Sequence, residues 1–374
     1  MTNNKDKKVL NVPNLRFPEF TDKWEAGKLE EYILLVSGQD LSSEQYTDKE
    51  DVYPYITGAS SLNSEGIILN RWTHTPTQIV KRGDILLVCK GSGVGQLTVL
   101  SNVDKAHIAR QIMGIRAKNT ESQLFIYHYL SRLMTELKKR STGIIPGIDR
   151  KSILSLHISI PSLQEQQKVA ELLSLIEQRI ITQNKIIEKL QSLIKGLRVC
   201  CMQRVYGNNV YLSEIAQIYQ PQTISSTELT EDGFLVYGAN GIIGKYKDYN
   251  HETEQICITC RGNTCGMVNY TKPMSWITGN AMVINTDKYQ DKVCKRYLYH
   301  YLSAYNFNSI ISGSGQPQIV RTPLEKLKIT LPTISEQKQK AIIFDKIQDK
   351  IDINHKVLNL YIGQKQYLLR QMFI

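Results

Sequence analysis

The sequence predicts an α+β (mixed α/β) fold in which two globular domains are separated by two long antiparallel coiled-coil helices, with an internal pseudo-twofold repeat. The first observation is that "IPSLQEQQKVA", which begins at Ile160, returns as "LPTISEQKQKA" at Leu331, 171 residues later. The second is that each copy opens a run of apolar residues at coiled-coil spacing. The third is that the segments between these runs mix short β-rich stretches with helical patterns.

The repeat extends upstream of the two helix starts. "YHYLSRL" at Tyr127 matches "YHYLSAY" at Tyr299, and "CKGSGVG" at Cys89 matches "CRGNTCG" at Cys260. "STGIIPGIDR" and "SGSGQPQIVR" match just before the helices, and "PYITGAS" resembles "LVYGANG". The order is the same in both halves, so one module is duplicated, although two copies are too few for a solenoid. The predicted division is 1–160 (first domain), 161–203 (first helix), 204–331 (second domain) and 332–374 (second helix).

The globular parts combine predicted strands and helices. "DILLVCKG", "QICITCRG" and "AMVINTD" are β-rich and end at Gly, Asn or Asp turn residues. "ESQLFIYHYLSRLMTELKKR" and "DKVCKRYLYHYLSAYNF" have the apolar spacing of helices, and "LHISIP" and "LKITLP" predict a last short strand in each half.

Each long helix begins after a proline. Ser162 and Thr333 are the predicted N-caps, and Glu165 and Glu336 follow at capping-box spacing. The coiled-coil seam of the first helix is predicted at Val169, Leu173, Ile176, Ile180, Gln183, Ile187, Leu190, Ile194 and Leu197. The seam of the second helix is predicted at Lys340, Phe344, Ile347, Ile351, Asn354, Leu358, Tyr361, Lys365 and Leu368.

An antiparallel arrangement follows from the chain path. The first helix leads into the second globular part and the second helix leaves it, and the ends of a domain are often close together. Gln183 and Asn354 are polar residues at the centre of each seam, so in a centred antiparallel pair they meet and set the helix register. The alternative is that each side chain is hydrated by itself.

Length, charge and cysteine usage restrict the class of protein. The 374 residues suffice for two ordinary domains, and no stretch approaches the ~20 apolar residues of a membrane span. The start has no apolar secretory region, and seven cysteines form no disulfide framework, so we expect a cytoplasmic protein without a membrane partner. The net charge of +11 is spread over all four parts, which permits nucleic acid as a partner without proving it.

Two related modules on a rigid spacer with pseudo-twofold symmetry suit a long polymer of regular spacing. A helix of about 40 residues is roughly 60 Å long, and one turn of duplex DNA is about 34–36 Å. Each module can therefore reach a major groove while the helices fix the separation. Double-stranded DNA is the expected partner, and the internal differences between the modules predict two different half-sites.

The chain resembles the specificity (S) subunit of a Type I restriction–modification system. The resemblance rests on the opening "VPNLRFPEFTDKWEAGKLEEY" and on the two pairs of helix junctions, and it covers nearly the whole chain. "PNLRFPEF" has no counterpart before the second module, where "MQRVYGNNVYLSEI" stands instead. The resemblance implies two target-recognition domains that read a bipartite asymmetric site, and helices that dock two methyltransferase subunits. It also implies restriction subunits as further partners, with S-adenosylmethionine, ATP and Mg held by partners rather than by this chain.

The motifs of the chemistry itself are missing from the sequence. There is no Asn-Pro-Pro-Tyr or Asp-Pro-Pro-Tyr, the pattern of adenine amino-methylation in that family, and no GxxxxGK[ST] phosphate loop. "KGSGVGQ" is interpreted as a tight turn after a strand. Cys257 and Cys260 form a single CxxC with Cys265 nearby, too few ligands for a structural zinc site. We therefore expect no catalytic, cofactor or metal site in the chain; the alternatives are a coiled-coil adaptor that binds proteins only, or a stand-alone DNA enzyme.

Candidate DNA contacts are basic and amide side chains, because Arg can grip guanine, Lys contacts phosphate and Gln can read adenine. The candidates are Arg71, Lys81, Arg82, Lys90, Arg110, Gln111, Lys245, Lys247, Arg261, Gln316 and Gln318. Arg150 and Arg321 match each other at the junctions, where the alternative is a structural clamp. Residues shared by the two halves cannot specify different half-sites, so base readers are expected where the halves differ, such as 71–82, 107–111 and 245–249.

Overall fold

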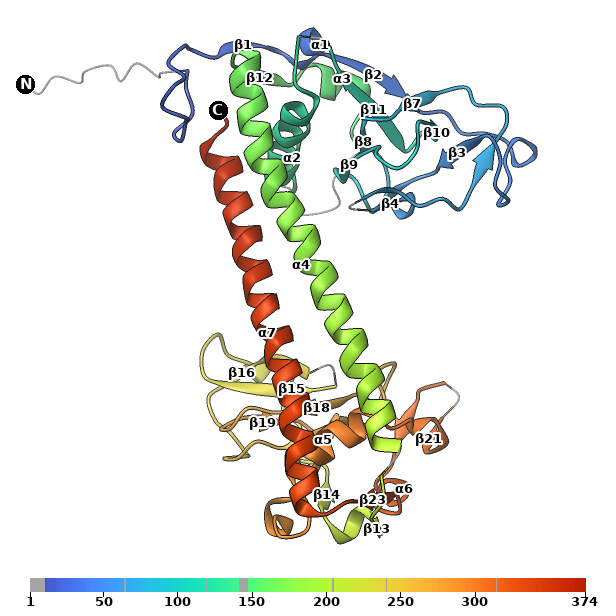
Figure 1. Cartoon of the computed structure of the whole chain (residues 1–374), viewed down its shortest axis with the longest axis vertical. Coiled ribbons are helices and arrows are strands. Elements are labelled where there is room, and N and C mark those ends of the chain that lie inside the picture. Colours follow the sequence, from blue (N-terminus) through green and yellow to red (C-terminus); the bar gives the residue numbers. More distant parts are fainter. Residues whose placement is uncertain are drawn as a thin grey trace, which may run out of the picture. The chain divides into compact units, whose positions relative to one another are not determined.

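The computed structural model describes residues 11–63, 65–118, 120–140, 147–203, 205–239, 241–313 and 315–374. Part of each predicted junction motif, residues 141–146 and Ser314, lies outside them. The chain divides into two compact units, Met1–Asn184 with Lys356–Ile374, and Lys185–His355. Each unit holds one globular domain and a part of each long helix (Figure 1). Within the described residues, no helix combines the length and apolarity needed to cross a membrane.

The first globular domain is built on two four-stranded sheets. The antiparallel sheet has the order β2 (Ile33–Ser37), β11 (Ile112–Ala117), β8 (Ile85–Val88) and β9 (Leu97–Val99). The second has the order β6 (Trp72–Thr73), β3 (Tyr53–Ile56), β10 (Lys105–Ile108) and β7 (Ile79–Lys81), with β10 parallel to β3. Smaller pairs join β1 (Glu25–Lys28) to β12 (His157–Ile160) and β4 (Leu62–Asn63) to β5 (Gly66–Ile67). The helices are α1 (Leu29–Tyr32), α2 (Gln123–Arg140) and α3 (Arg150–Leu154).

Strand β11 shows how the sequence divides the core. Successive side chains of a strand point to opposite faces. Met113 and Ile115 join the cluster formed with α2 and the long helices, whereas Ile112 joins the cluster shared with the other sheet. The run Ile85–Val88 is buried at every position, since both faces of β8 are covered.

The second domain repeats this plan. Its antiparallel sheet has the order β14 (Gln217–Tyr219), β20 (Ala281–Asn285), β17 (Ile256–Thr259) and β18 (Val268–Tyr270). Its other sheet has the order β16 (Gly241–Tyr246), β15 (Phe234–Gly238) and β19 (Trp276–Ile277), with β15 parallel to β19. The remaining elements are β13 (Asn208–Tyr211) paired with β23 (Lys328–Leu331), β21 (Ile311–Ser312) paired with β22 (Gln318–Ile319), α5 (Lys295–Ala304) and α6 (Arg321–Glu325). The mixed α/β duplication predicted from sequence is confirmed.

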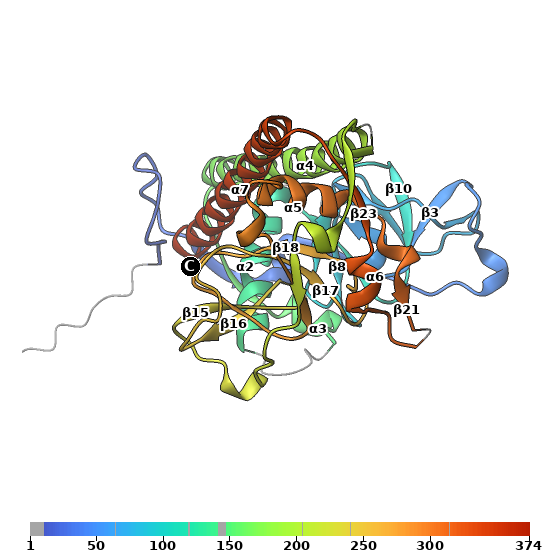
Figure 2. The ribbon, with the colours of Figure 1, turned by 90° about the horizontal axis from the view of Figure 1, so that it is seen from below.

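The long helices are α4 (Leu163–Gln203) and α7 (Ile334–Gln371). Every predicted seam position is buried or half-buried. The pairing is antiparallel in the first unit, where Glu177 binds Lys365 at 2.8 Å and the Arg179 guanidinium lies 5.9 Å from the Tyr361 ring centre. In the second unit, α5 lies between the sheet and the long helices (Figure 2), and the Lys340 Nζ lies 3.5 Å from the Cys201 carbonyl oxygen.

The polar pair at the centre of the seam stays a prediction. Gln183 is 8% exposed, and the Asn354 amide donates to the Lys350 carbonyl one turn earlier in its own helix. The two residues belong to different compact units. The predicted four-part division of the chain stays a prediction too.

Candidate nucleic-acid interface

Several loops meet at one side of the first domain, and we call this region the first loop edge. It consists of residues 37–40 at and after the end of β2, Gly58 after β3, Lys90–Gly91 after β8, Arg110–Gln111 between β10 and β11, and 147–150 before and at the start of α3.

Backbone hydrogen bonds hold the first loop edge together. The Cys89 amide donates to the Gln111 carbonyl at 2.8 Å, and the Ile148 amide donates to the Cys89 carbonyl at 2.8 Å. Gly58 is packed against the Gln111 side chain, since a Cβ at this glycine would lie 2.6 Å from Gln111 Oε1. Segments far apart in sequence are thereby fixed in one rigid rim.

The second domain builds a similar rim from the corresponding loops, and we call it the second loop edge. It consists of residues 220–223 after β14, Gly238 at the end of β15, Arg261–Gly262 after β17, Gly279–Asn280 between β19 and β20, and 316–318 around the start of β22. The Cys260 amide donates to the Asn280 carbonyl at 3.2 Å, and the Ile319 amide donates to the Cys260 carbonyl at 3.0 Å. These bonds match those of Cys89, so the two rims share one backbone frame.

The loop edges gather most of the matched candidates. Lys90 and Arg261 occupy the same position on the two rims; both are exposed, and neither has an ion-pair partner within the described residues. Arg261 pairs through its backbone with Gln318, so these two predicted contacts are neighbours. Gln316 and Gln318 are exposed. Such a rim, with exposed cations and amide side chains, can contact phosphate oxygens and base edges.

The two junction arginines have different partners, although they match in sequence. Arg150 opens α3 and donates through Nη1 to the Leu35 carbonyl at 2.8 Å and to Ser37 Oγ at 3.3 Å. It therefore ties α3 to β2, which supports the structural alternative. Arg321 opens α6 and pairs with Glu325 of the same helix at 2.7 Å, leaving its side chain 61% exposed.

Three candidates of the first domain are not part of its loop edge. Arg71 pairs with Asp48 at 3.3 Å and stacks over the Tyr46 ring at 4.7 Å. Lys81 and Arg82 stand where β10 begins, at the opposite end of that strand from Arg110, and Arg82 pairs with Asp104 at 2.9 Å.

Lys245 and Lys247 lie on and just after β16. Lys245 pairs with Asp232 at 3.4 Å, and the Lys247 ammonium lies 6.0 Å from the Tyr246 ring centre. Both ammonium groups remain accessible, but neither residue is part of the second loop edge.

His107 was expected within a base-reading segment, and the structure gives it another role. It is fully buried, its Nδ1 accepts from the Thr77 and Gln78 amides, and its Nε2 donates to the Gln39 carbonyl at 2.9 Å. Burial lowers the pKa of this imidazole, so the ring stays neutral in that arrangement. It positions the loop after β2 instead of presenting an edge to DNA.

The CxxC cysteines point to opposite faces of their sheet. Cys257 packs with Tyr237 and Ile277, whereas Cys260 joins the cluster on the other face with Ile258. Burial raises the pKa of the Cys257 thiol to about 12. Two thiols on opposite sides of a sheet cannot share one tetrahedral ion.

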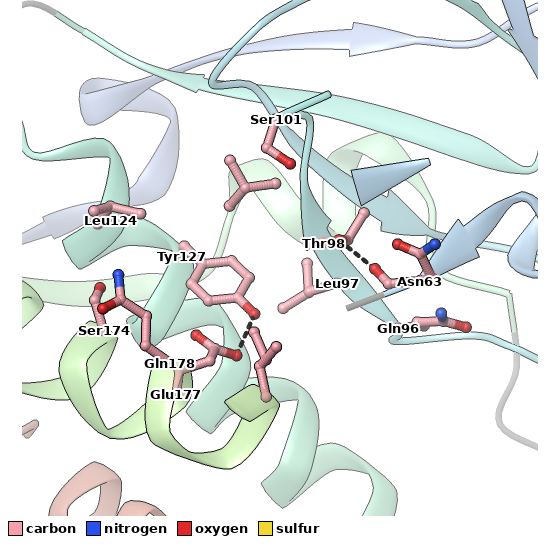
Figure 3. A pocket seen from close by; sticks show the side chains of 12 residues that line it. Asn63, Gln96, Leu97, Thr98, Ser101, Leu124, Tyr127, Ser174, Glu177 and Gln178 are labelled. Carbon is pink, nitrogen blue, oxygen red and sulfur yellow. Dashed lines mark hydrogen bonds between the residues drawn. The ribbon is translucent and has the colours of Figure 1, made fainter. Parts of the chain in front are cut away.

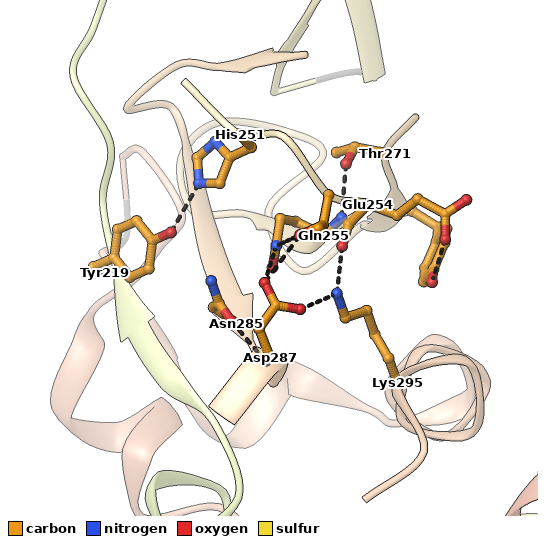
Figure 4. A network of polar contacts seen from close by, with 10 residues as sticks. Tyr219, His251, Glu254, Gln255, Thr271, Asn285, Asp287 and Lys295 are labelled. Carbon is orange, nitrogen blue, oxygen red and sulfur yellow. Dashed lines mark hydrogen bonds and ion pairs between the residues drawn. The ribbon is translucent and has the colours of Figure 1, made fainter. Parts of the chain in front are cut away.

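In the second domain, a partly buried polar network lies beside the start of β17 and the end of β20 (Figure 4). Asp287 accepts from Gln255 at 2.8 Å and from Lys295 at 2.5 Å. Burial alone would raise the pKa of Asp287, but these hydrogen bonds lower it overall. In the first domain, Asp84 occupies the position of Gln255 and receives Arg116 at 2.5 Å. The network is therefore a structural device whose charges differ between the copies.

The first unit also contains an open cavity of about 500 Å³ between β9, α2 and α4 (Figure 3). Tyr127 and Glu177 line it and share a hydrogen bond of 3.0 Å. None of the predicted DNA contacts lines this cavity, so it is separate from the loop edge.

Asp40 lies on the first loop edge and is not among the residues predicted from the sequence. Its carboxylate receives the Arg110 amide at 3.1 Å and pairs with Arg110 Nε at 2.7 Å. Seventy residues separate the two in the chain, and no local pattern marks the pair. The only available signal was the difference between "IARQIM" and "ITGNAM" at equivalent places in the two halves.

Comparison with known proteins supplies an independent finding. The family "Type I restriction modification DNA specificity domain" matches twice, over residues 21–192 and 208–360. The MjaVIII type I restriction enzyme specificity subunit of Methanocaldococcus jannaschii is 25% identical, over 94% of this chain and 92% of its own length. The EcoprrI specificity subunit of Escherichia coli is 31% identical over 38% of this chain and 36% of its own length.

Solved structures share the fold. The S subunit of a type I restriction–modification system from M. genitalium matches with a TM-score of 0.67 and 18% identity, covering 97% of this chain and 99% of its own. A chain from a structure on complex assembly and conformational transition of the type I R-M system matches with a TM-score of 0.56 and 15% identity, covering 92% and 96%. At these identities the likeness concerns the fold alone.

Proposed function

We propose that this chain, which belongs to the type I restriction modification DNA specificity family, is the DNA-reading and non-catalytic subunit of a type I restriction–modification complex. Each globular domain reads one half of a bipartite, asymmetric double-stranded site. The long helices set the separation of the halves and dock two methyltransferase subunits, and restriction subunits complete the nuclease. S-adenosylmethionine, ATP and Mg belong to those partners.

The observation that carries the proposal is the duplication of one loop edge with different side chains. Both rims present an exposed cation at the same place, Lys90 and Arg261, without an ion-pair partner among the described residues, which suits the phosphates common to all DNA. Around it the side chains differ, as two unlike half-sites require. A protein-only adaptor would have no need for two such rims, and both halves match a DNA specificity family.

The experiment is methylome sequencing of cells that carry the chain with its methyltransferase partner. We expect a bipartite motif that disappears when the chain is omitted. Replacing residues 15–160 by the corresponding part of another family member should change one half-site and leave the other intact. A simultaneous change in both half-sites would contradict the two-reader proposal, and methyl transfer by the purified chain alone would contradict the non-catalytic role.

The spacer role has its own test. Each helical residue adds about 1.5 Å and 100°. Four residues inserted near Gly196 should lengthen the unread spacer by one or two base pairs with both half-sites unchanged. Gly196 is suitable because its surroundings within 4 Å are open. A two-residue insertion should rotate the second module by about 200° and abolish binding. An unchanged spacer in the four-residue variant would show that the helices do not set it.

A further inference from the structure

The two loop edges carry different side chains at one equivalent turn, which precedes β11 in the first domain and β20 in the second. In the first domain this turn is Arg110–Gln111, and in the second it is Gly279–Asn280. The backbone frame is the same, because the amides of Cys89 and Cys260 donate to the carbonyls of Gln111 and Asn280. The difference therefore concerns side chains on a common scaffold.

Arg110 contacts Asp40 through its backbone amide and Nε, and the rest of its side chain is largely exposed. Asp40 receives its backbone amide at 3.1 Å through Oδ1 and pairs with Nε at 2.7 Å through Oδ2. The Arg110 side chain is 70% exposed and that of Asp40 is 45% exposed. Within the described residues, the two terminal guanidinium nitrogens have no hydrogen-bond partner. The carboxylate thus limits the rotation of the guanidinium, while most of the Arg110 side chain stays exposed.

The second domain is built without a side chain at this position. A Cβ on Gly279 would lie 2.5 Å from Thr223 Oγ1 and 2.9 Å from the Pro221 carbonyl oxygen. Gln220 also donates to the Gly279 carbonyl at 3.1 Å. Thr223 and Gly279 therefore fill, in close contact, the place where the first domain has Asp40 and Arg110.

A residue that reads a base must differ between two domains that read different half-sites, whereas residues that contact phosphate can be shared. Arg110 and Asp40 differ from their counterparts, as a base reader requires. Lys90 and its counterpart Arg261 are both basic, as a shared phosphate contact requires. Arginine contacts guanine O6 and N7 through two N–H groups, the commonest specific contact in the major groove. With Nε engaged by Asp40, the terminal nitrogens supply those two donors.

We propose that Arg110 reads a guanine in the half-site of the first domain, with Asp40 as its positioning residue. This inference rests on the proposed function, because it presumes that the first loop edge contacts DNA. It assigns to the second domain a half-site that is read without an arginine at the equivalent turn.

The test uses the full chain co-expressed with its methyltransferase partner, with methylome sequencing and competition binding to duplexes that carry every single-base change. Arg110→Ala should make one G·C position of one half-site degenerate and reduce the preference for guanine there on the order of ten- to hundredfold. The other half-site should stay unchanged. Asp40→Asn should weaken the preference at the same base position by a smaller factor, which a merely structural role would not produce.

Two matched variants separate base reading from charge. Lys90→Ala removes a cation from the same rim and should weaken binding to all sequences alike, with the motif preserved. Lys28→Ala removes an exposed cation that pairs with Glu30 at 3.8 Å, away from the loop edge, and should leave motif and affinity unchanged.

The outcomes are distinguishable. If wild-type cells show a bipartite motif and Arg110→Ala leaves every position of it intact, the assignment of Arg110 is wrong while the proposed function stands. Uniform weakening without loss of base preference would make Arg110 a phosphate contact and equally overturn the assignment. Absence of any motif in wild-type cells with an active methyltransferase would instead refute the proposed function.

Discussion

The two starts of the long helices have nearly the same sequence, and yet their glutamates have different partners. In α7, Glu336 accepts from the Thr333 amide at 3.1 Å and from its hydroxyl at 2.9 Å, while Thr333 Oγ1 accepts from the Glu336 amide at 3.3 Å. This is the predicted capping box, and it is exposed. In α4, Ser162 caps the helix through the Glu165 amide at 3.4 Å, but the Glu165 carboxylate turns away. The prediction of a reciprocal box at Glu165 is therefore wrong.

Glu165 is bound by a segment that occurs only once in the chain. Arg16, from "PNLRFPEF", donates two hydrogen bonds of 2.7 Å to its carboxylate, and Trp24 donates a third at 3.3 Å. The Glu165 side chain is 2% exposed. Because two charged hydrogen bonds outweigh one local capping bond, the glutamate is recruited into the core. Both copies of the motif therefore start a helix, but the glutamate side chain caps the helix only in α7. In α4 it binds Arg16 instead.

The next residue of the motif behaves alike in both copies. Gln166 accepts from the Ser122 amide and Gln337 from the Cys294 amide, and each donates to the carbonyl of the preceding proline. These glutamines satisfy backbone groups at the starts of α2 and α5. Because both halves have these backbone groups, the glutamine makes the same contacts in both copies.

The largest effect that would sharpen this comparison is expected from Arg16→Ala. The variant leaves the buried Glu165 carboxylate without its cation, so the first unit should lose about 3–5 kcal/mol of stability. The measurement is hydrogen exchange of peptides from α2 and the start of α4, with thermal unfolding alongside. Glu336→Ala is the matched variant in the second unit and should cost far less. Equal losses in the two variants would show that Glu165, like Glu336, acts only as a cap. The double variant Arg16→Met with Glu165→Gln should recover part of the lost stability.

The second effect concerns the equivalent histidines of α2 and α5. Burial lowers the pKa of His128 to about 4, and the His128 Nε2 lies 3.1 Å from Ser174 Oγ, whereas His300 pairs with Asp345 at 2.7 Å. The His128 imidazole is protonated near pH 6.5 in the unfolded state but only near pH 4 in the folded state. The free energy of unfolding therefore falls as the pH drops from about 6.5 to about 4. We expect a loss of about 2 kcal/mol by pH 5 in the first unit.

Hydrogen exchange of α2 peptides between pH 7 and pH 4.5, corrected for intrinsic rates, measures this loss. His128→Asn should cost stability at pH 7 but flatten the pH dependence. The α5 peptides serve as the internal control, because Asp345 opposes the effect of burial on the pKa of His300. An unchanged slope in the variant would assign the acid sensitivity to other groups.

The smallest effect is expected at the caps themselves. Thr333→Ala removes both capping interactions of α7 and should cost about 1 kcal/mol, seen as faster exchange in the first turn of that helix. Ser162→Ala should cost less, since Glu165 and its partners already fix the first turn of α4. A larger loss from Ser162→Ala would contradict the view that the Arg16 contact has replaced the box.

Periodicity and repetition were sufficient for the elements. The seam residues of both long helices, the strands around Ile85 and Ile256, and the helices around Tyr127 and Tyr299 lie where the sequence predicted them. These signals are local, since a helix or strand is defined by side chains a few residues apart. The parallel pairing of β3 with β10 and of β15 with β19 could not be predicted, because each joins segments about 40 to 50 residues apart without a local signature.

The sequence by itself determined the duplication, the two long helices and the residue types available for binding DNA. Only the tertiary structure decided which of those residues act together. It buried His107 and engaged Arg150 with Leu35 and Ser37. It placed Lys81 beside the start of β10 and Arg110 after its end, and it brought Asp40 to Arg110 across seventy residues. The physical reason is that a side chain's partners are set by long-range packing, which brings loops of distant strands to one edge, whereas its residue type reports only what it could bind.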